Sequence, residues 1–180
     1  MTTTGEDVAA VPSKDEPHRT SVGPGIASLN PSYFALVMAT GIVSLAGRLL
    51  DLPSVASALF WLNLVLFVIL WVLTGTRLIL FRRQFLADVI DHKRGVGFFT
   101  AVAASCVLGT QCLLIAEWRT LAIALWYLGI ALWFVLTYTI FTSFAVKEVK
   151  PSLADGIHGG WLVSVVAAQS VSVLGSLLAA

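Results

Sequence analysis

Five long stretches of this 180-residue chain contain no charged side chain: residues 31–47, 53–76, 95–116, 120–146 and 159–180. The 11 Lys and Arg residues and the 10 Asp and Glu residues all lie between these stretches or in the first 30 residues. A water-exposed helix needs a polar face, and about 20 apolar residues suffice to cross the hydrocarbon core of a bilayer. The pattern predicts an all-α polytopic membrane protein and excludes a soluble enzyme, a disordered protein and a nucleic-acid-binding protein.

The expected domain boundaries follow from the same pattern. Transmembrane spans are expected at about 31–50, 53–76, 95–116, 120–146 and 159–180, which together make a transmembrane domain of residues 31–180. Residues 1–30 are rich in Thr, Ser, Pro and Gly with mixed charges and have no apolar run, so we expect a disordered cytoplasmic tail.

The basic residues predict an orientation, because cytoplasmic loops of membrane proteins carry an excess of Lys and Arg. Nine basic residues fall on the side of the N-terminus, and only Arg48 and Arg119 fall on the other. The nine are Lys14, Arg19, Arg77, Arg82, Arg83, Lys93, Arg94, Lys147 and Lys150. We therefore expect a protein of the plasma (inner) membrane with its N-terminus in the cytoplasm.

The connection after the second span has a helical pattern of its own. Its apolar residues recur at helical spacing among Arg82, Arg83 and Asp88, and they are Leu78, Phe81, Phe85, Leu86, Val89 and Ile90. This pattern is typical of a helix that lies along the membrane interface with its apolar stripe toward the lipid tails. A regulatory docking site is the alternative interpretation.

The odd-numbered and even-numbered spans differ in composition. Gly, Ala, Ser, Thr and Cys make up about half of the residues in the odd spans and a third in the even spans, whereas 11 aromatic residues fall in the even spans and 5 in the odd. Small residues let helix backbones approach closely or leave room beside a cavity. We therefore expect the odd spans to form a parallel inner ring, with the even spans packed outside it.

Polar residues within the spans have two interpretations each. The four-residue repeats Ser164–Ala168–Ser172–Ser176–Ala180 and Ala101–Ser105–Gly109 fit packing seams, or a pathway lined by hydroxyl groups. The amides of Gln111 and Gln169 fit hydrogen bonds between helices, or a role in a pore. No Asp, Glu or His lies inside a span, which favours passive flow of anions over a proton relay.

The cysteines and histidines predict no cofactor and no metal site. Cys106 and Cys112 point about 120° apart on one helix, so they cannot form a disulfide within it. They fit apolar packing residues better than redox or metal-binding residues. His18, His92 and His158 fall in three separate polar segments with no ligand spacing between them.

Three of the stretches resemble a known family. The segments NPSYFALVMATGIVSLAG (30–47), GVGFFTAVAASCVLGTQ (95–111) and GGWLVSVVAAQSVSVLG (159–175) are similar to the tellurite-resistance/C4-dicarboxylate transporter family, in the superfamily of plant slow anion channels and fungal sulfite exporters. The resemblance implies a ten-helix ring of five hairpins around a pore, often as a homotrimer. This chain would supply about half of that ring, as an N-terminal half or a fragment.

The resemblance also implies where the pore lies. It places Phe34, Met38 and Gly41 on the first pore helix. The expected pore-lining residues of the third and fifth spans are Ser105, Gly109, Ala168, Gln169 and Ser172. The family's gating phenylalanine belongs to the ninth helix, which this chain does not contain.

The expected function is therefore transport of a small anion, such as a C4-dicarboxylate or an oxyanion, across the lipid bilayer. Because half of the ring is absent, we expect the 180-residue chain to conduct poorly by itself. The alternative is an accessory or structural membrane subunit without a pathway of its own. An enzyme is not expected, because no catalytic acid pair, His cluster or nucleophile–base set lies near either interface.

Overall fold

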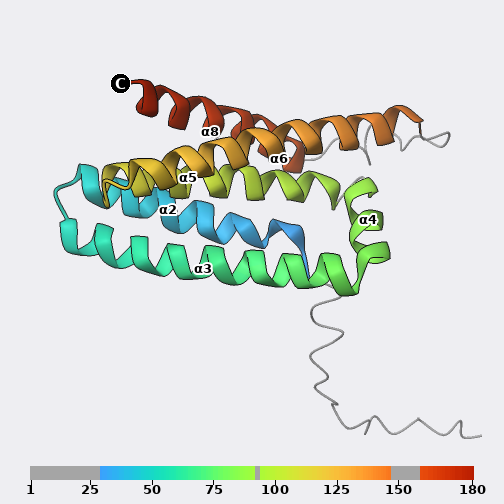
Figure 1. Cartoon of the computed structure of the whole chain (residues 1–180), viewed down its shortest axis with the longest axis horizontal. Coiled ribbons are helices and arrows are strands. Elements are labelled where there is room, and N and C mark those ends of the chain that lie inside the picture. The colour runs from blue at the N-terminus through green and yellow to red at the C-terminus, as the bar shows by residue number, and fades with distance from the viewer. Residues whose placement is uncertain (1–28, 92–93, 147–158) are drawn as a thin grey trace, which may run out of the picture.

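The computed structural model describes residues 29–91, 94–146 and 159–180, and all regular structure in these ranges is helical (Figure 1). Five segments are long and apolar enough to cross a membrane, which confirms the predicted all-α fold with five membrane-spanning helices. The elements are η1 (Pro31–Tyr33), α2 (Phe34–Leu49), α3 (Pro53–Leu80), α4 (Arg82–Ile90), η2 (Gly95–Phe98), α5 (Phe99–Leu114), α6 (Arg119–Val146), η3 (Gly159–Trp161) and α8 (Leu162–Ala179). The predicted tail lies outside the described residues, except for Leu29 and Asn30.

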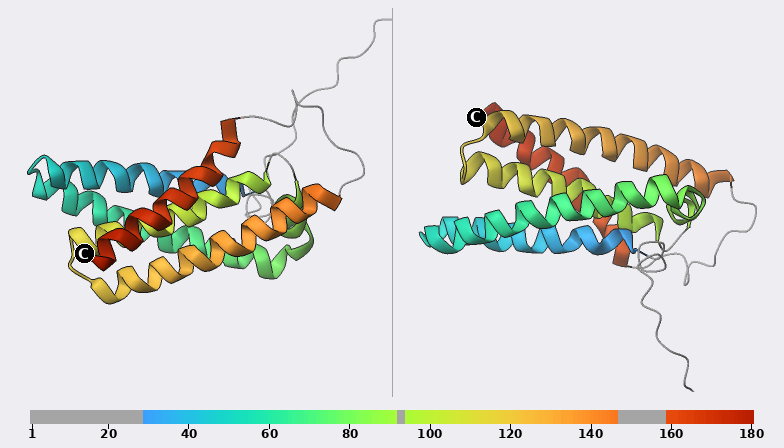
Figure 2. Two further views of the ribbon diagram at one scale, coloured as in Figure 1. Left: turned by 90° about the horizontal axis from the view of Figure 1, so that it is seen from above. Right: turned by 60° about the horizontal axis from the view of Figure 1, so that its bottom comes forward.

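The five long helices form two layers. Helices α2, α5 and α8 run in the same direction, and α3 and α6 run back in the opposite one (Figure 1). α5 packs against α2 on one side and against α8 on the other, while α3 packs on α2 and α6 packs on both α5 and α8. α8 crosses α5 at an angle (Figure 2). The three helices rich in small residues therefore lie next to one another, as their composition predicts.

α5 is the most enclosed helix of the bundle. In the apolar segment of its span, Gly95–Leu114, 89% of the residues are buried. The buried share is 28% in Pro31–Leu49 and 11% in Gly159–Ala179. Small side chains on α5 make this enclosure possible, because they let four neighbouring helices approach its backbone. α2 and α8 have the same kind of composition but keep one face exposed.

Two tight turns, one between α2 and α3 and one between α5 and α6, lie at the end of the bundle opposite α4. Asp51 and Glu117 both adopt positive φ angles, of 55° and 58°, a conformation that non-glycine residues rarely adopt. The first turn is fixed by the Ser44 hydroxyl, which donates to the Ala56 carbonyl across 2.8 Å. The second is closed by the Trp118 backbone N–H, which donates to the Cys112 carbonyl across 2.8 Å. Each turn holds an inner helix against the outer helix that follows it.

Some aromatic residues of the outer layer face outward, and others pack between helices. Trp61, Phe134 and Tyr138 are exposed, at 54%, 65% and 69%, as expected for side chains that meet lipid. Trp126 instead turns inward, where its indole Nε1–H donates to the Val171 carbonyl of α8 across 3.0 Å. Its ring also covers Gly175, so a glycine of the inner layer makes room for a tryptophan of the outer one.

Helix α4 only partly matches the interfacial helix predicted for it. Val89 is buried, and Phe85 packs edge-on against Phe98, with ring centroids 5.1 Å apart. Leu86 and Ile90 are exposed. The apolar stripe is therefore divided: one side of α4 packs on the chain's own core, and only the other side is free to meet lipid.

The packing predicts that volume added at the centre of the inner layer is costly. A Cβ at Gly109 would lie 2.5 Å from Leu174 Cδ2 and 3.4 Å from Leu125 Cβ, whereas a Cβ at Gly75 would meet nothing within 4 Å. We expect Gly109→Val to lower the free energy of unfolding in detergent by about 1–3 kcal/mol, the usual effect of overpacking. Gly75→Val is the matched control and should stay near the wild type; equal losses in both variants would contradict this packing.

Candidate permeation pathway

The three inner helices begin side by side at the same end of the bundle. A short 3₁₀ turn precedes each of them, and η2 contacts both η1 and η3. The approach of η1 to η2 is close, because a Cβ at Gly97 would lie 2.5 Å from Ser32 Oγ. The Thr100 hydroxyl reinforces the contact, because it can donate a hydrogen bond to the Pro31 carbonyl (3.1 Å) and to the Gly97 carbonyl (2.6 Å). The motifs NPS, GVG and GGW thus mark one structural feature that occurs three times.

This arrangement gives that end of the inner layer a positive character. The N-terminus of a helix carries a partial positive charge, because its first backbone N–H groups have no partner in the helix. Three parallel helices place three such ends together, and helix N-termini are ready-made sites for anions. α5 and α8 contain no charged residue, and α2 contains only Arg48, in its last turn.

Two of the three α2 residues expected to line the pore, Phe34 and Gly41, instead pack against neighbouring helices. Phe34 is buried, and its ring meets Phe67 and Trp71 of α3 at centroid distances of 6.4 and 5.6 Å. Gly41 is buried where α2 approaches α5, so that an added Cβ would run into Val107. Met38 is half-buried and packs against the same apolar cluster as Phe34.

The two α5 positions are also in contacts between helices. Ser105 is fully buried, and its hydroxyl donates to the Ala101 carbonyl of its own helix across 2.8 Å. Gly109 lies where α5 meets Leu125 of α6 and Leu174 of α8. The repeat that contains Ser105 and Gly109 thus takes part in helix packing, one of the two interpretations that the sequence allows.

The α8 positions are the open ones. Ala168 is half-buried, while Gln169 and Ser172 are exposed on the side away from the buried residues Ala167 and Leu174. The Ser172 hydroxyl donates to the Ala168 carbonyl across 3.3 Å. The structure does not gather the eight residues on one surface, and pore lining by them stays a prediction.

A buried pair of amides joins the outer and inner layers. Asn63 Nδ2 of α3 donates to Gln111 Oε1 of α5 across 2.6 Å, and both side chains are fully buried. Asn63 Oδ1 and Gln111 Nε2 have no hydrogen-bond partner within the described ranges. Sequence reasoning identified Gln111 and not Asn63, although an amide inside an apolar span is itself the signal that marks such a contact.

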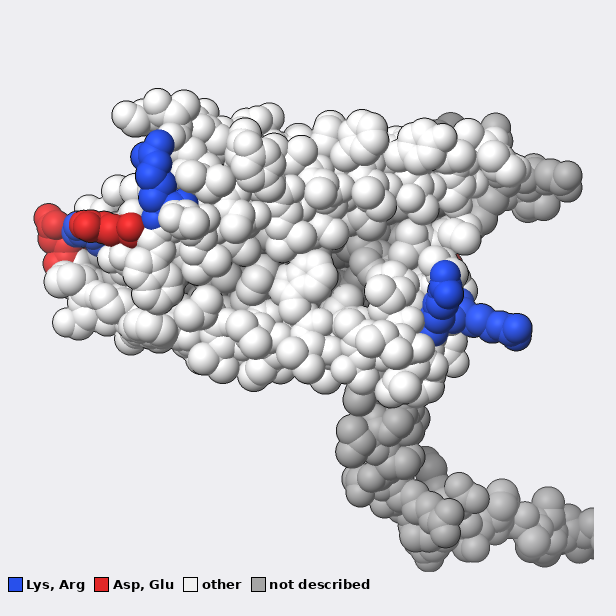
Figure 3. Space-filling view, viewed as in Figure 1, with Lys and Arg blue, Asp and Glu red and all other residues white. Residues whose placement is uncertain are grey.

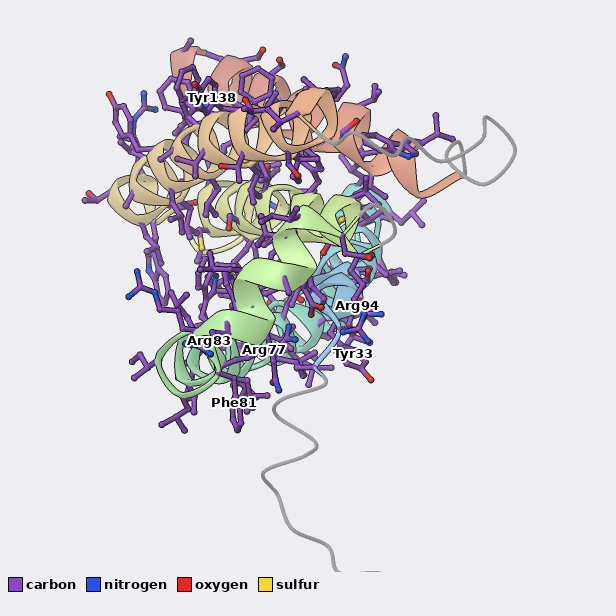
Figure 4. All side chains as sticks on the ribbon, turned by 90° about the vertical axis from the view of Figure 1, so that its right-hand side faces the viewer. Tyr33, Arg77, Phe81, Arg83, Arg94 and Tyr138 are labelled. Carbon is purple, nitrogen blue, oxygen red and sulfur yellow. The ribbon has the colours of Figure 1, made fainter. Side chains whose placement is uncertain are left out.

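A cluster of charged residues fixes the end where the inner helices begin. Asp88 of α4 accepts from Arg77 Nη2 across 2.5 Å and from Arg94 Nη1 across 3.0 Å. Arg77 is only 2% exposed and also donates to the Leu29 carbonyl across 2.8 Å. Arg77 and Arg94 approach the cluster from α3 and from the start of the third span (Figure 4). The cluster ties α3 and α4 to the residue that precedes η2 at the start of the third span.

The described residues contain no group of three His, Cys, Asp or Glu side chains that could hold a metal ion. All three histidines lie outside the described residues. Cys106 and Cys112 are buried free thiols inside α5.

Comparisons with known proteins agree with a membrane bundle of this kind. The family model described as voltage-dependent anion channel matches residues 28–180. Two proteins of Methanocaldococcus jannaschii, each named as an uncharacterized transporter, are 32% identical over 155 residues and 26% identical over 160 residues. The alignments cover 82% and 85% of this chain but 44% and 46% of the relatives. No solved structure matches.

The matching family model covers all five membrane-spanning segments, and the family is one of membrane channels and transporters. The chain belongs to this family, the voltage-dependent anion channel family SLAC1. The expected membership of the slow anion channel superfamily is thereby confirmed. The chain spans about half the length of the curated relatives it matches.

The amide pair predicts a non-additive effect of mutation. Asn63→Leu should lower the free energy of unfolding in detergent by about 1–2 kcal/mol, because it leaves the Gln111 amide buried with no partner. Adding Gln111→Met should recover most of the loss, since both polar groups are then gone. A double variant as unstable as the sum of the two single variants would show that the amides do not interact.

Proposed function

We propose that α2, α5 and α8 form one half of the wall of a pathway for small anions, such as C4-dicarboxylates or oxyanions. The observation that carries the proposal is the gathering of three parallel helix N-termini at one end of the inner layer. Family membership supports it. The pathway itself takes shape only when the other side of the wall is present.

The proposed selectivity for anions rests on which groups can face a passing ion. Helix N-termini attract negative charge, and a ring of carboxylates, which would favour cations, has no residue to build it on α2, α5 or α8. The exposed amide of Gln169 can donate hydrogen bonds to an anion. The Ser172 hydroxyl can do so after it leaves the Ala168 carbonyl.

Closure of the pathway needs further helices along the open faces of α2 and α8. α5 has an inner helix packed on each side and is largely buried. α2 and α8 each have an inner helix, α5, on one side only. We propose that these faces are covered by helices equivalent to the other half of the relatives. By the same reasoning, the 180-residue chain alone conducts poorly.

The remaining features of the proposal concern location and assembly. The excess of basic residues favours an inner-membrane protein with a cytoplasmic N-terminus; Arg77, Arg82, Arg83 and Arg94 lie at the α4 end, and the other five basic residues of that side lie outside the described residues. The family resemblance favours a homotrimer. No nucleic acid and no cofactor is proposed as a partner.

The test measures flux of labelled succinate and sulfite into liposomes. The chain is reconstituted alone, and together with a complementary five-helix segment taken from a full-length member of the family. We expect little flux from the chain alone and anion flux from the pair. Substantial flux from the chain alone would contradict the need for closure, and cation flux from the pair would contradict the proposed selectivity.

Substitutions of Gln169 test its role in the paired complex. Gln169→Leu removes the amide donor, and Gln169→Glu adds a negative charge that repels anions. We expect at least tenfold lower anion flux for the first, since a hydrogen bond to a charged group contributes about 1.5–3 kcal/mol and about 1.4 kcal/mol is a factor of ten. We expect a larger loss for the second. Phe134→Leu, at an exposed position of α6, is the control; equal effects in all three variants would remove Gln169 from the pathway.

An accessory subunit is the second candidate function, and the low burial of α8 favours it, because a helix that is open on one side can also pack on another protein. Anion flux that depends on Gln169 would exclude this alternative. A stable complex with an unrelated membrane protein, without flux of its own, would favour it.

A further inference from the structure

A groove runs between the two outer helices on the side of the bundle away from the inner layer. Its deep part is a cavity of about 330 Å³ walled by α3 and α6 and closed at one end by α4. Phe34, Phe98 and Ala101 form the floor. A shallower cavity continues it along the same two helices, and Trp71 lines both. Figure 3 shows a hollow between these helices on this face.

The groove is suited to hydrocarbon. Apart from Arg77, Thr74 and Thr139, its deep part is lined by Gly, Pro and apolar side chains, and the Arg77 charge is already paired with Asp88. Between Leu78 and Phe67 the axis of α3 rises about 16 Å at 1.5 Å per residue. That length is roughly half of the ~30 Å hydrocarbon core, which corresponds to one leaflet.

Two arginines lie at the end of the groove where a lipid headgroup would sit. Arg82 and Arg83 precede Leu86, which lines the groove, by four and three residues on α4. Residues at these spacings are neighbours on one side of a helix. Both arginines are exposed, and neither forms an ion pair with a carboxylate of the described residues. Basic side chains are visible beside the hollow in Figure 3. In Figure 4, Arg83 lies on the side of α4 opposite Arg94.

A second copy of the chain fits this surface less well than a lipid. Helices associate in membranes mainly through small residues, which allow close approach. The exposed residues that line the groove are bulky, with Leu78 at 43%, Leu86 at 48% and Val135 at 59% exposed. Paired arginines at the end of an apolar channel also complement a phosphate followed by an acyl chain.

We propose that this groove binds an anionic phospholipid, with one acyl chain between α3 and α6 and the phosphate held by Arg82 and Arg83. The site belongs to the outer surface of the bundle and is separate from the proposed pathway. It also connects α4 to the bilayer, since the helix that closes the groove carries both arginines. Lipid composition would thereby act on the α4 end of the bundle.

The test is native mass spectrometry of the whole chain in detergent, with phosphatidylglycerol or phosphatidylcholine of identical acyl chains. Arg82→Gln/Arg83→Gln removes the headgroup contacts, and Arg48→Gln/Arg119→Gln removes two charges at the other end of the bundle as the matched control. Gly75→Leu fills the groove, because a Cβ at Gly75 meets nothing within 4 Å. Gly159→Leu is its control, at a described glycine that also has nothing within 4 Å of an added Cβ and that lies outside the groove.

We expect phosphatidylglycerol to be retained roughly tenfold more than phosphatidylcholine, as two basic residues near a headgroup favour an anionic lipid. The double α4 variant should lose this preference, and Gly75→Leu should reduce the retention of both lipids, while both controls behave as the wild type. Equal retention of the two lipids by the wild type would overturn the proposal. Dimers that disappear with Gly75→Leu would also overturn it, because a second copy would then occupy the groove.

Discussion

Close approach of helix backbones around α5 is the interaction on which the arrangement of this protein depends. In a bilayer the hydrophobic effect does not drive helices together, so packing and hydrogen bonds between helices must do so. Gly41 lets α2 approach α5, Gly109 admits Leu174 of α8, and Gly129 of α6 lies against Cys106. The buried Asn63–Gln111 hydrogen bond adds a polar contact between the layers. These contacts place three helix N-termini at one end, which is the basis for proposing an anion pathway.

The charge cluster at the α4 end complements this apolar packing. Asp88 accepts from two arginines, and it thereby connects α4 to the end of α3 and to the start of the third span. A nearly buried arginine needs such a partner, because an unpaired charge there would be strongly destabilising. One side of α4 is thus fixed to the bundle, and the other side carries Arg82 and Arg83, which are exposed and form no ion pair with a carboxylate in the described part of the chain. That division gives the helix a structural role and, in our proposal, a role in lipid binding.

The sequence predicted the layers better than it predicted the site. Charge-free runs define membrane spans directly, and the contrast between small and aromatic residues correctly indicated which helices lie side by side. The rotation of each helix about its axis is set by contacts that composition does not reveal. Small residues serve both close packing and the lining of a pore, so a repeat such as that of Ser105 and Gly109 does not show which face it occupies. Asn63 is a different case, since an amide inside an apolar run is itself a signal of a hydrogen bond between helices.

Disulfide trapping across both sides of α5 tests the central arrangement most directly. The pairs Gly41→Cys/Val107→Cys and Gly109→Cys/Leu174→Cys each exchange a close contact between a glycine and an aliphatic side chain for two thiols, in a background with Cys106 and Cys112 replaced by Ala. Oxidation in membranes should cross-link both pairs, whereas Val43→Cys/Val107→Cys, with its first thiol on the exposed face of α2, should not react. Efficient cross-linking of the Val43 pair, with neither of the other two, would contradict the described packing of α5 against α2 and α8.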